Sequence, residues 1–168
     1  MTFPACLPVI LNSEGDRFVV DQGGPTKLGV TQRTLSAFLG RAASVEDVRS
    51  LTPDAVSPLY ESQFYNAAHC NELAAGVDLM IFDEAVNEGV GRAVRHLQQA
   101  LGVIADGAFG PATLAAAQRA DPAALIAGLH ETNAAYYASL AAAFPKDEHG
   151  WLARNDRTRT LALGMIGS

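Results

Sequence analysis

The pattern of apolar and polar positions predicts a mainly helical chain with one short hairpin near its start. The stretch from Pro4 to Leu11 is apolar enough for a short buried helix, and Gly15 stands where a glycine commonly ends a helix. The apolar triplets 18–20 and 28–30 flank a Gly-Gly-Pro turn at 23–25, which is typical of a β-hairpin.

Capping residues and apolar faces predict further helices after the hairpin. Thr31, Ser44 and Thr52 each occupy a helix-start position, and Gly40 ends the first of these helices. The segment 77–87 is apolar nearly all round, which is the pattern of a central buried helix. The remaining ranges predicted to be helical are 53 to about 68, 92–101, 122 to about 144, and a last basic helix that carries Arg157 and Arg159.

Composition fits one globular domain, or two small ones that share a core. The chain has 168 residues, of which 49% are hydrophobic and 18% are charged. No apolar run approaches the length of a membrane-spanning helix, so we expect no membrane insertion. The formal net charge of −6 and the lack of clustered Lys and Arg exclude a nucleic-acid partner.

Cysteine and histidine usage gives no sign of a metal site or a cofactor. Cys6 and Cys70 are too few for a disulfide framework, and the four histidines lack metal-ligand spacing. The start of the sequence lacks the basic segment of a secretory signal, so the expected site of synthesis is the cytoplasm, with export by another route.

Two carboxylates near the hairpin are candidates for catalysis. Glu14 is expected on the last turn of the first helix, where the negative end of the helix dipole favours a protonated acid. Asp21 directly precedes the hairpin turn. An acid paired with a second carboxylate is the arrangement that glycoside hydrolysis uses, but a solvated helix end and a turn cap need the same two residues.

The motif around these carboxylates resembles the E-G-G…D-x-G-G-x-T-x-x-G-I-T signature of glycoside hydrolase family 108, the phage and prophage N-acetylmuramidases or endolysins. The matching positions are Glu14-Gly15, Asp21, Gly23-Gly24-Pro25-Thr26 and Gly29-Val30-Thr31. The resemblance implies that Glu14 is the catalytic acid. It gives Asp21 the role of nucleophile or base, with a turn cap as the alternative, and the spacing from Glu14 is shorter than in the family pattern. The hydroxyls of Thr26 and Thr31 position a water or hold the hairpin.

Three later segments extend this resemblance. Residues 82–89 are similar to the family's F-D-x-A-V-N-x-G, so Asp83 and Asn87 form either a buried network or a pair that faces the substrate. Tyr65 falls where the family carries a Tyr-Trp pair near its glycan cleft, and Trp151 belongs to a G-W-x-x-R match. Each of these aromatic residues stacks on a sugar or packs in the core.

A second resemblance covers residues 97–114, which are similar to the L-Q-x-x-L-G-x-x-x-D-G-x-x-G-P-x-T-L pattern of peptidoglycan-binding modules. The same residues also suit a plain connector between two helices. Together the resemblances imply a lysozyme-like helical fold with one β-hairpin over 1–88, and a three-helix peptidoglycan-binding-like half over 89–168 packed against it.

The function that follows is hydrolysis of the β-1,4 bond between N-acetylmuramic acid and N-acetylglucosamine in bacterial peptidoglycan, with Glu14 as general acid. The proposed partner is the glycan strand, reached in the cell wall or periplasm after release, and the expected oligomeric state is a monomer. The alternative is a non-catalytic peptidoglycan-binding or structural protein of phage or secretion systems on the same fold.

Overall fold

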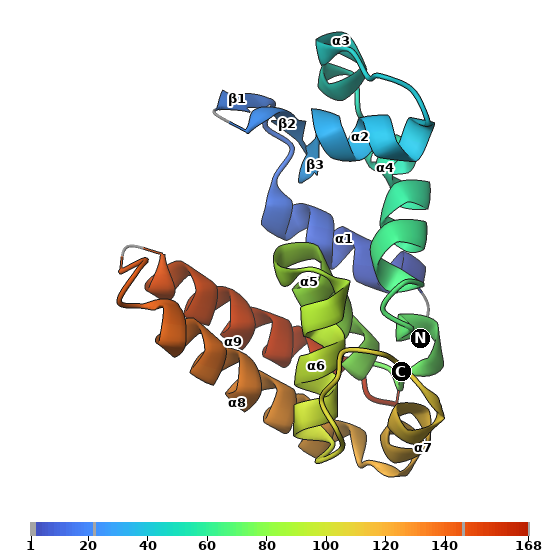
Figure 1. The fold of residues 1–168 in the computed structure, drawn as a ribbon, viewed down its shortest axis with the longest axis vertical. Coiled ribbons are helices and arrows are strands. Elements are labelled where there is room, and N and C mark those ends of the chain that lie inside the picture. Colours follow the sequence, from blue (N-terminus) through green and yellow to red (C-terminus); the bar gives the residue numbers. More distant parts are fainter. Residues whose placement is uncertain (1–2, 22, 146, 168) are drawn as a thin grey trace. The chain divides into compact units, whose positions relative to one another are not determined.

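The chain folds into helices and one small sheet, seen in a computed structural model that describes residues 3–21, 23–145 and 147–167 (Figure 1). Contacts divide it into two compact units. The N-terminal unit comprises Pro4–Gln63, and the C-terminal unit comprises Phe3 and the chain from Phe64 onward. Each unit has its own buried residues and its own polar contacts.

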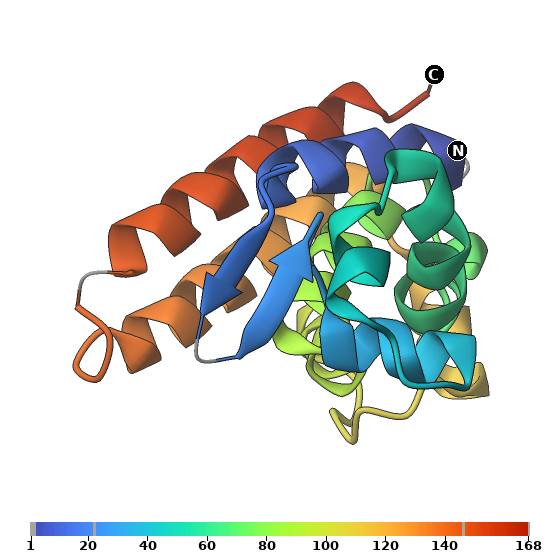
Figure 2. The same cartoon turned by 90° about the horizontal axis from the view of Figure 1, so that it is seen from above.

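The N-terminal unit combines an antiparallel sheet with four helices. Figure 2 shows β1 and β2 side by side, which confirms the predicted hairpin, and β3 extends it to three strands. Asp21 lies opposite Gly24 in the first pair, and Thr26 lies opposite Thr31 in the second. The elements are α1 (Phe3–Glu14), β1 (Val19–Asp21), β2 (Gly24–Lys27), β3 (Val30–Thr31), α2 (Gln32–Leu39), α3 (Val45–Arg49) and α4 (Pro53–Tyr60).

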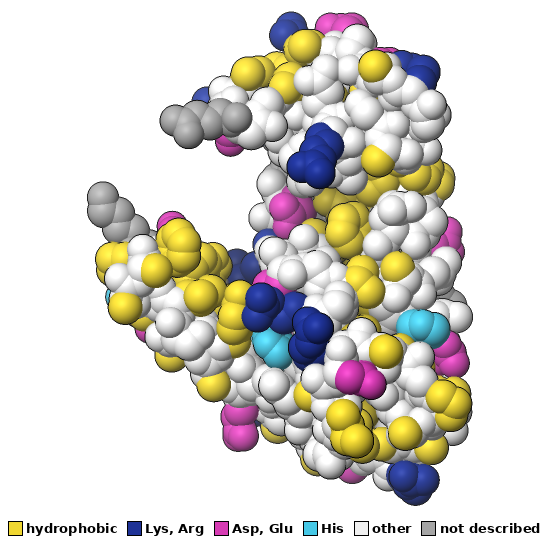
Figure 3. Space-filling model, in the orientation of Figure 1, with side chains coloured by type: hydrophobic (Ala, Val, Ile, Leu, Met, Phe, Trp, Pro, Cys, Tyr) yellow, Lys and Arg dark blue, Asp and Glu magenta, His cyan; other side chains and the backbone are white. Residues whose placement is uncertain are grey.

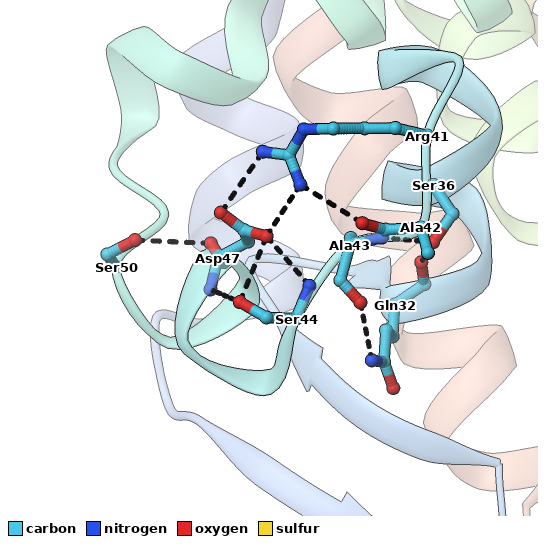
Figure 4. Close-up of polar contacts among 8 residues, drawn as sticks. All are labelled: Gln32, Ser36, Arg41, Ala42, Ala43, Ser44, Asp47 and Ser50. Atoms are coloured by element: carbon cyan, nitrogen blue, oxygen red, sulfur yellow. Dashed lines mark hydrogen bonds and ion pairs between the residues drawn. The ribbon is translucent and has the colours of Figure 1, made fainter.

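Local capping places the helices of this unit where the sequence predicts them. Ser44 and Asp47 form a reciprocal capping box at the start of α3, and Gly40 ends α2 in the left-handed conformation with φ 66°. Figure 4 shows Arg41 closing this region with hydrogen bonds to Asp47. The guanidinium of Arg41 holds the pKa of the Asp47 carboxyl well below its usual range.

The helix that begins at Pro53 ends earlier than predicted. Regular α-helix stops at Tyr60, and a π-helical turn, η1 (Glu61–Tyr65), continues it. The hydroxyl of Ser62 donates to the carbonyl of Pro58 at 2.8 Å. Side-chain bonds of this kind compete for helix carbonyls and bend helices, which accounts for the wider turn.

The C-terminal unit is helical throughout its regular structure. Its central helix, α5, contacts α6, α8 and α9, and every residue from Val77 to Ala85 is buried, as predicted for a helix that is apolar on all sides. The elements are η2 (Cys70–Glu72), α5 (Val77–Glu88), α6 (Val90–Ala100), α7 (Pro111–Arg119), α8 (Pro122–Leu140) and α9 (Glu148–Gly164).

The long helix α8 also ends before its predicted limit near Phe144. It stops at Leu140, where the amides of Ala143 and Phe144 both bond to the Leu140 carbonyl at 2.9 Å. Pro145 follows, and the residue before a proline is disfavoured in helical conformation. Among the helices that the structure describes, none has the length and apolar character to cross a membrane.

Candidate functional site

Glu14 ends α1 and lies against the turn that joins β2 to β3. Gly15 follows it with φ 72°, and its amide bonds to the Leu11 carbonyl at 3.0 Å, which closes the helix as the sequence predicts. The Glu14 side chain is half-buried. Its carboxyl is therefore held at a helix end while remaining accessible from solvent.

Gly29 in the β2–β3 turn allows the close approach of Glu14. A Cβ atom on Gly29 would lie 2.9 Å from Oε2 of Glu14 and 2.5 Å from the hydroxyl oxygen of Tyr60. Gly29 also has φ 71°, a conformation that favours glycine. Two independent constraints therefore require glycine at this position of the motif.

Tyr60, the last residue of α4, fixes the same turn. Its ring is 1% exposed, and its hydroxyl donates to the Leu28 carbonyl at 2.8 Å. The sequence places Tyr60 in the predicted helix that starts at 53, and nothing in the local pattern marks it as part of the site. Its role in holding the turn beside Glu14 depends on a contact across 32 positions, which local pattern does not reveal.

Asp21 ends β1 and is exposed. Its Oδ1 accepts a hydrogen bond from the amide of Gly23 at 2.7 Å, which is the turn-capping geometry that the sequence allowed. The remaining acceptor capacity of an exposed carboxylate stays available to water or a ligand. A cap and a catalytic role are therefore compatible in this residue.

The two threonines of the motif face each other across β2 and β3. Thr26 is half-buried opposite Thr31 in the strand register. The Thr31 hydroxyl oxygen accepts the Thr34 amide at 3.1 Å and so caps α2. Thr31 thus links the sheet to α2, and Thr26 lies beside it on the neighbouring strand.

Tyr65 and Asp83 are buried within the C-terminal unit. The Tyr65 ring is 3% exposed, lies 5.3 Å from the rings of Phe3 and Phe82, and donates through its hydroxyl to Asp78 at 2.9 Å. Asp83 accepts from Arg154, with Nη2 at 2.8 Å and Nε at 3.0 Å from Oδ1. The Tyr65 hydroxyl and the Asp83 carboxylate therefore both have hydrogen-bond partners within the C-terminal unit.

Asn87 lies one turn beyond Asp83 on α5. Its Nδ2 donates to the backbone carbonyl of Asp83 at 2.7 Å, so the two side chains do not bond to each other. The Asn87 side chain is exposed, unlike that of Asp83. Of this pair, only Asn87 presents an amide group to solvent.

Trp151 lies at the edge of a cavity of about 340 Å³. Its ring is half-buried and stacks on Tyr137 with the ring centroids 5.6 Å apart. The same cavity is lined by Asn87, Glu88 and Arg92, so it brings two of the predicted substrate-binding residues together. Glu88 and Arg92 were not singled out by sequence analysis.

A buried polar cluster joins α5, α6 and α8. Nδ1 of His96 lies 2.8 Å from Oε2 of Glu84 and 2.9 Å from Oδ1 of Asn133. Burial raises the pKa of Glu84 to about 7, although its bond to His96 acts in the opposite direction. The sequence shows only that His96 lacks metal-ligand spacing. Its partners Glu84 and Asn133 lie 12 and 37 positions away, so local pattern does not reveal the cluster.

The loop of the second resemblance is organised by Gln98 on α6. Its Nε2 donates to Oδ1 of Asp106 at 2.8 Å, and its Oε1 accepts the Gly107 amide at 2.8 Å. The ring of Phe109, in the same loop, stacks on the ring of His69 with the centroids 4.4 Å apart. These contacts suit the connector role that the sequence left open beside ligand recognition.

The predicted residues divide between the two units. Glu14, Asp21, Thr26 and Thr31 belong to the N-terminal unit, whereas Tyr65, Asp83, Asn87 and Trp151 belong to the C-terminal unit. In the part of the chain that the structure describes, no group of three His, Cys, Asp or Glu side chains could hold a metal ion. Cys6 and Cys70 are both buried and are not bridged to each other.

Comparisons with known proteins match both halves of the sequence. Residues 7–89 match the family described as Glycosyl hydrolase 108, and residues 92–156 match a family described as "Predicted Peptidoglycan domain". The solved structure of Brucella abortus SagA is similar with a TM-score of 0.87 and 34% sequence identity, covering 99% of this chain and 96% of that chain. No curated protein gives a significant match.

Proposed function

The chain belongs to the glycosyl hydrolase 108 family, with a lysozyme-like fold and a peptidoglycan-binding domain, and on this basis we propose that it hydrolyses peptidoglycan. The bond is the β-1,4 linkage from N-acetylmuramic acid to N-acetylglucosamine, and the site of action is the cell wall. The observation that carries the proposal is the half-buried carboxyl of Glu14, held at the end of α1 against Gly29.

Glu14 acts as the general acid in this proposal. A positioned carboxylic acid protonates the leaving oxygen while positive charge develops at the anomeric carbon. The close packing of Gly29 and the Tyr60 hydroxyl around Glu14 restricts the rotamers open to its side chain. Such restriction keeps the proton donor in one place, which is the main contribution that a scaffold makes to acid catalysis.

Asp21 and Thr26 complete the catalytic group. Asp21, fixed by the Gly23 amide, stabilises the charged centre or activates a water, and the Thr26 hydroxyl positions that water. A carboxyl separation of about 5 to 5.5 Å suits a retaining nucleophile and roughly 6.5 to 9.5 Å suits an inverting base. The anomeric form of the first product, measured by NMR, distinguishes the two roles of Asp21.

Substrate binding is assigned to the exposed or half-exposed groups. Asn87 and Trp151 of the C-terminal unit contact the glycan, and Thr31 holds the β3–α2 junction of the N-terminal unit. Asp83 positions Asn87 and Arg154, to which it is bonded, and Tyr65 is held in the core by Asp78. The proposal therefore separates residues that touch the substrate from residues that position them.

The deciding experiment compares wild type with Glu14→Gln on purified sacculi at about 0.15 M salt, where charge repulsion by an anionic wall is damped. The amide keeps the shape of the side chain but donates no acid proton. Release of reducing sugar is expected to fall by about a hundredfold to ten-thousandfold, with pelleting on sacculi retained.

Glu61→Gln is the matched control, because it makes the same chemical change at an exposed position of the same unit. It is expected to hydrolyse sacculi at the wild-type rate. Equal, non-zero hydrolysis by wild type and Glu14→Gln would remove Glu14 from the mechanism. A wild type that pellets with sacculi but releases no reducing ends would instead be a non-catalytic wall-binding protein.

A further inference from the structure

Glu88 is a buried carboxylate that lines the Trp151 cavity. Its side chain is 7% exposed, and neither of its oxygens has a hydrogen-bond partner within 3.5 Å among the described residues. Nε of Arg92 lies 3.7 Å from Oε2, which is an ion-pair distance without a hydrogen bond. A carboxylate in this state is destabilising unless a donor reaches it.

Burial also raises the pKa of Glu88, and Asp83 acts in the same direction. The Tyr137 hydroxyl, His96 and Arg92 oppose this effect but do not cancel it. The carboxyl is therefore poorly stabilised as an anion by its own unit. Any ligand that brings a hydroxyl or amide hydrogen into the cavity would relieve that condition.

The walls of the cavity have the composition of a sugar-binding site. Trp151 and Tyr137 form a stacked aromatic pair, and the Arg92 guanidinium lies 4.3 Å from the centre of the Tyr136 ring. Figure 3 shows hydrophobic side chains gathered where α8 ends and α9 begins. A pyranose ring offers an apolar face to such aromatic groups and hydroxyls to the polar groups beside them.

The charges around the cavity favour a neutral ligand. Arg154 is engaged by Asp83 through two nitrogens, and Arg92 faces Glu88, so the two cations and two anions offset each other. A volume of about 340 Å³ is at the small end for ligand sites and fits a single sugar unit. The Arg92 side chain is 44% exposed, so solvent reaches its ion pair with Glu88.

We propose that this cavity of the C-terminal unit binds one N-acetylhexosamine unit of the glycan, with Glu88 accepting a hydrogen bond from it and Trp151 packing against its ring. The ligand class rests on the proposed function, since the glycan is the same polymer. Glu88 is a binding residue here and takes no part in bond cleavage.

Trp151 is the only tryptophan of the sequence, so its emission reports on the cavity. The test titrates the full chain with tri-N-acetylchitotriose and records tryptophan fluorescence. Glu14→Gln serves as the background, because it prevents cleavage during the titration. A saturable change in emission is expected, and Glu88→Gln on that background should bind about tenfold to a hundredfold more weakly.

Thermal unfolding separates binding from a structural role. Glu88→Gln replaces a buried carboxylate, whose oxygens lack a hydrogen-bond donor in the described part of the chain, with a neutral group of the same shape, so its midpoint should equal or exceed that of the background. Glu131→Gln, an exposed acid on α8 that does not line the cavity, should match the background in both measurements.

The inference is overturned if tryptophan emission does not change up to about 10 mM trisaccharide, a concentration above the dissociation constant of even a weak, millimolar complex. It is also overturned if Glu88→Gln binds as tightly as the background, or if it unfolds at a clearly lower temperature. Hydrolysis of sacculi by wild type without an emission change would reject this subsite alone. Saturable binding without hydrolysis by wild type would reject the proposed activity alone.

Discussion

Arg154 donates to Asp83 through both Nε and Nη2 across 71 positions of the sequence. The two side chains are 15% and 8% exposed, and the Thr158 hydroxyl also faces Asp83 at 3.4 Å. Because Asp83 belongs to α5 and Arg154 to α9, this pair ties the last helix to the central one. The fork geometry of arginine is what allows two nitrogens to reach one carboxylate.

Arg154→Lys should lower the stability of the chain. Lysine offers a single ammonium group and leaves part of a buried carboxylate unsatisfied, and breaking a buried ion pair by removing one partner costs about 3 to 5 kcal/mol. We expect roughly half of that loss or more for the lysine variant, measured by urea denaturation. Arg157→Lys, at an exposed position of the same helix, is the control and should stay within about 0.5 kcal/mol of wild type. Equal midpoints for the two variants would contradict a stabilising role for the pair.

Most of the helix ends that were predicted correctly were recognised from residues close together in the sequence. Thr31, Ser44, Thr52 and Gly40 mark helix ends through bonds within a few residues, and all four were placed correctly. The end of α1 at Glu14 was likewise predicted from Gly15. A cap depends on residues that are adjacent in sequence, so a single chain suffices to recognise it.

Long-range partners could not be predicted in the same way. The sequence indicated that polar groups on the buried helix 77–87 need partners, but the partners of Asp83 and Glu84 lie on α9, α6 and α8. The third strand was missed because β3 contains only two residues, too few for a periodic pattern. The roles of the predicted site residues in catalysis and binding remain predictions.

The Glu84–His96 pair should make stability fall as pH rises. Burial holds the folded pKa of Glu84 near 7, above its ordinary value of 4.5, so between these values the folded chain keeps a proton that the unfolded chain has lost. For His96, burial lowers the pKa, but the hydrogen bond and charge of Glu84 outweigh it and leave the pKa above 6.5. Both groups therefore favour the folded state at low pH, and Glu88 and Asn133 face the same cluster.

The measurement is the thermal midpoint of wild type and Glu84→Gln between pH 5 and pH 8. Relative to the variant, wild type should lose several degrees over this range, since about 1 kcal/mol moves the midpoint by roughly 2 to 4 °C in a chain of this size. Glu72→Gln, an exposed acid paired with a histidine of its own, controls for charge removal. Parallel curves for wild type and Glu84→Gln would show that the pair does not titrate as argued.

Fragments cut at the boundary of the compact units should fold, whereas fragments cut at the boundary of the family matches should not. The two family matches meet between residues 89 and 92, whereas the compact units meet between Gln63 and Phe64. The helix α5 is buried on all sides by α6, α8 and α9. A fragment 1–88 would expose those faces, and a fragment 89–168 would lose its central helix.

We therefore expect fragment 64–168 to unfold cooperatively and fragments 1–88 and 89–168 to lack a cooperative transition. Circular dichroism during heating, with the full chain as reference, provides the measurement. A sharp transition in fragment 1–88 at the temperature of the full chain would contradict the central position of α5. It would also favour independent halves divided at residue 88.

Gly29→Ala should impair hydrolysis by displacing Glu14. The added methyl group would meet the Tyr60 hydroxyl and the Glu14 carboxylate within 3 Å, and φ of 71° is strained for alanine. Gly40→Ala is a matched control: Gly40 has φ 66° but no atom within 4 Å of an added Cβ, so it bears the backbone strain alone, about 1 kcal/mol. Both variants should therefore lose stability, but only Gly29→Ala should also lose at least tenfold in the release of reducing ends from sacculi, because a shift of about 1 Å in a catalytic group can reduce rates a hundredfold. Activities are compared at a temperature where unfolding curves show both variants fully folded. If the two then hydrolyse sacculi equally, the contact between Gly29 and Glu14 has no part in catalysis.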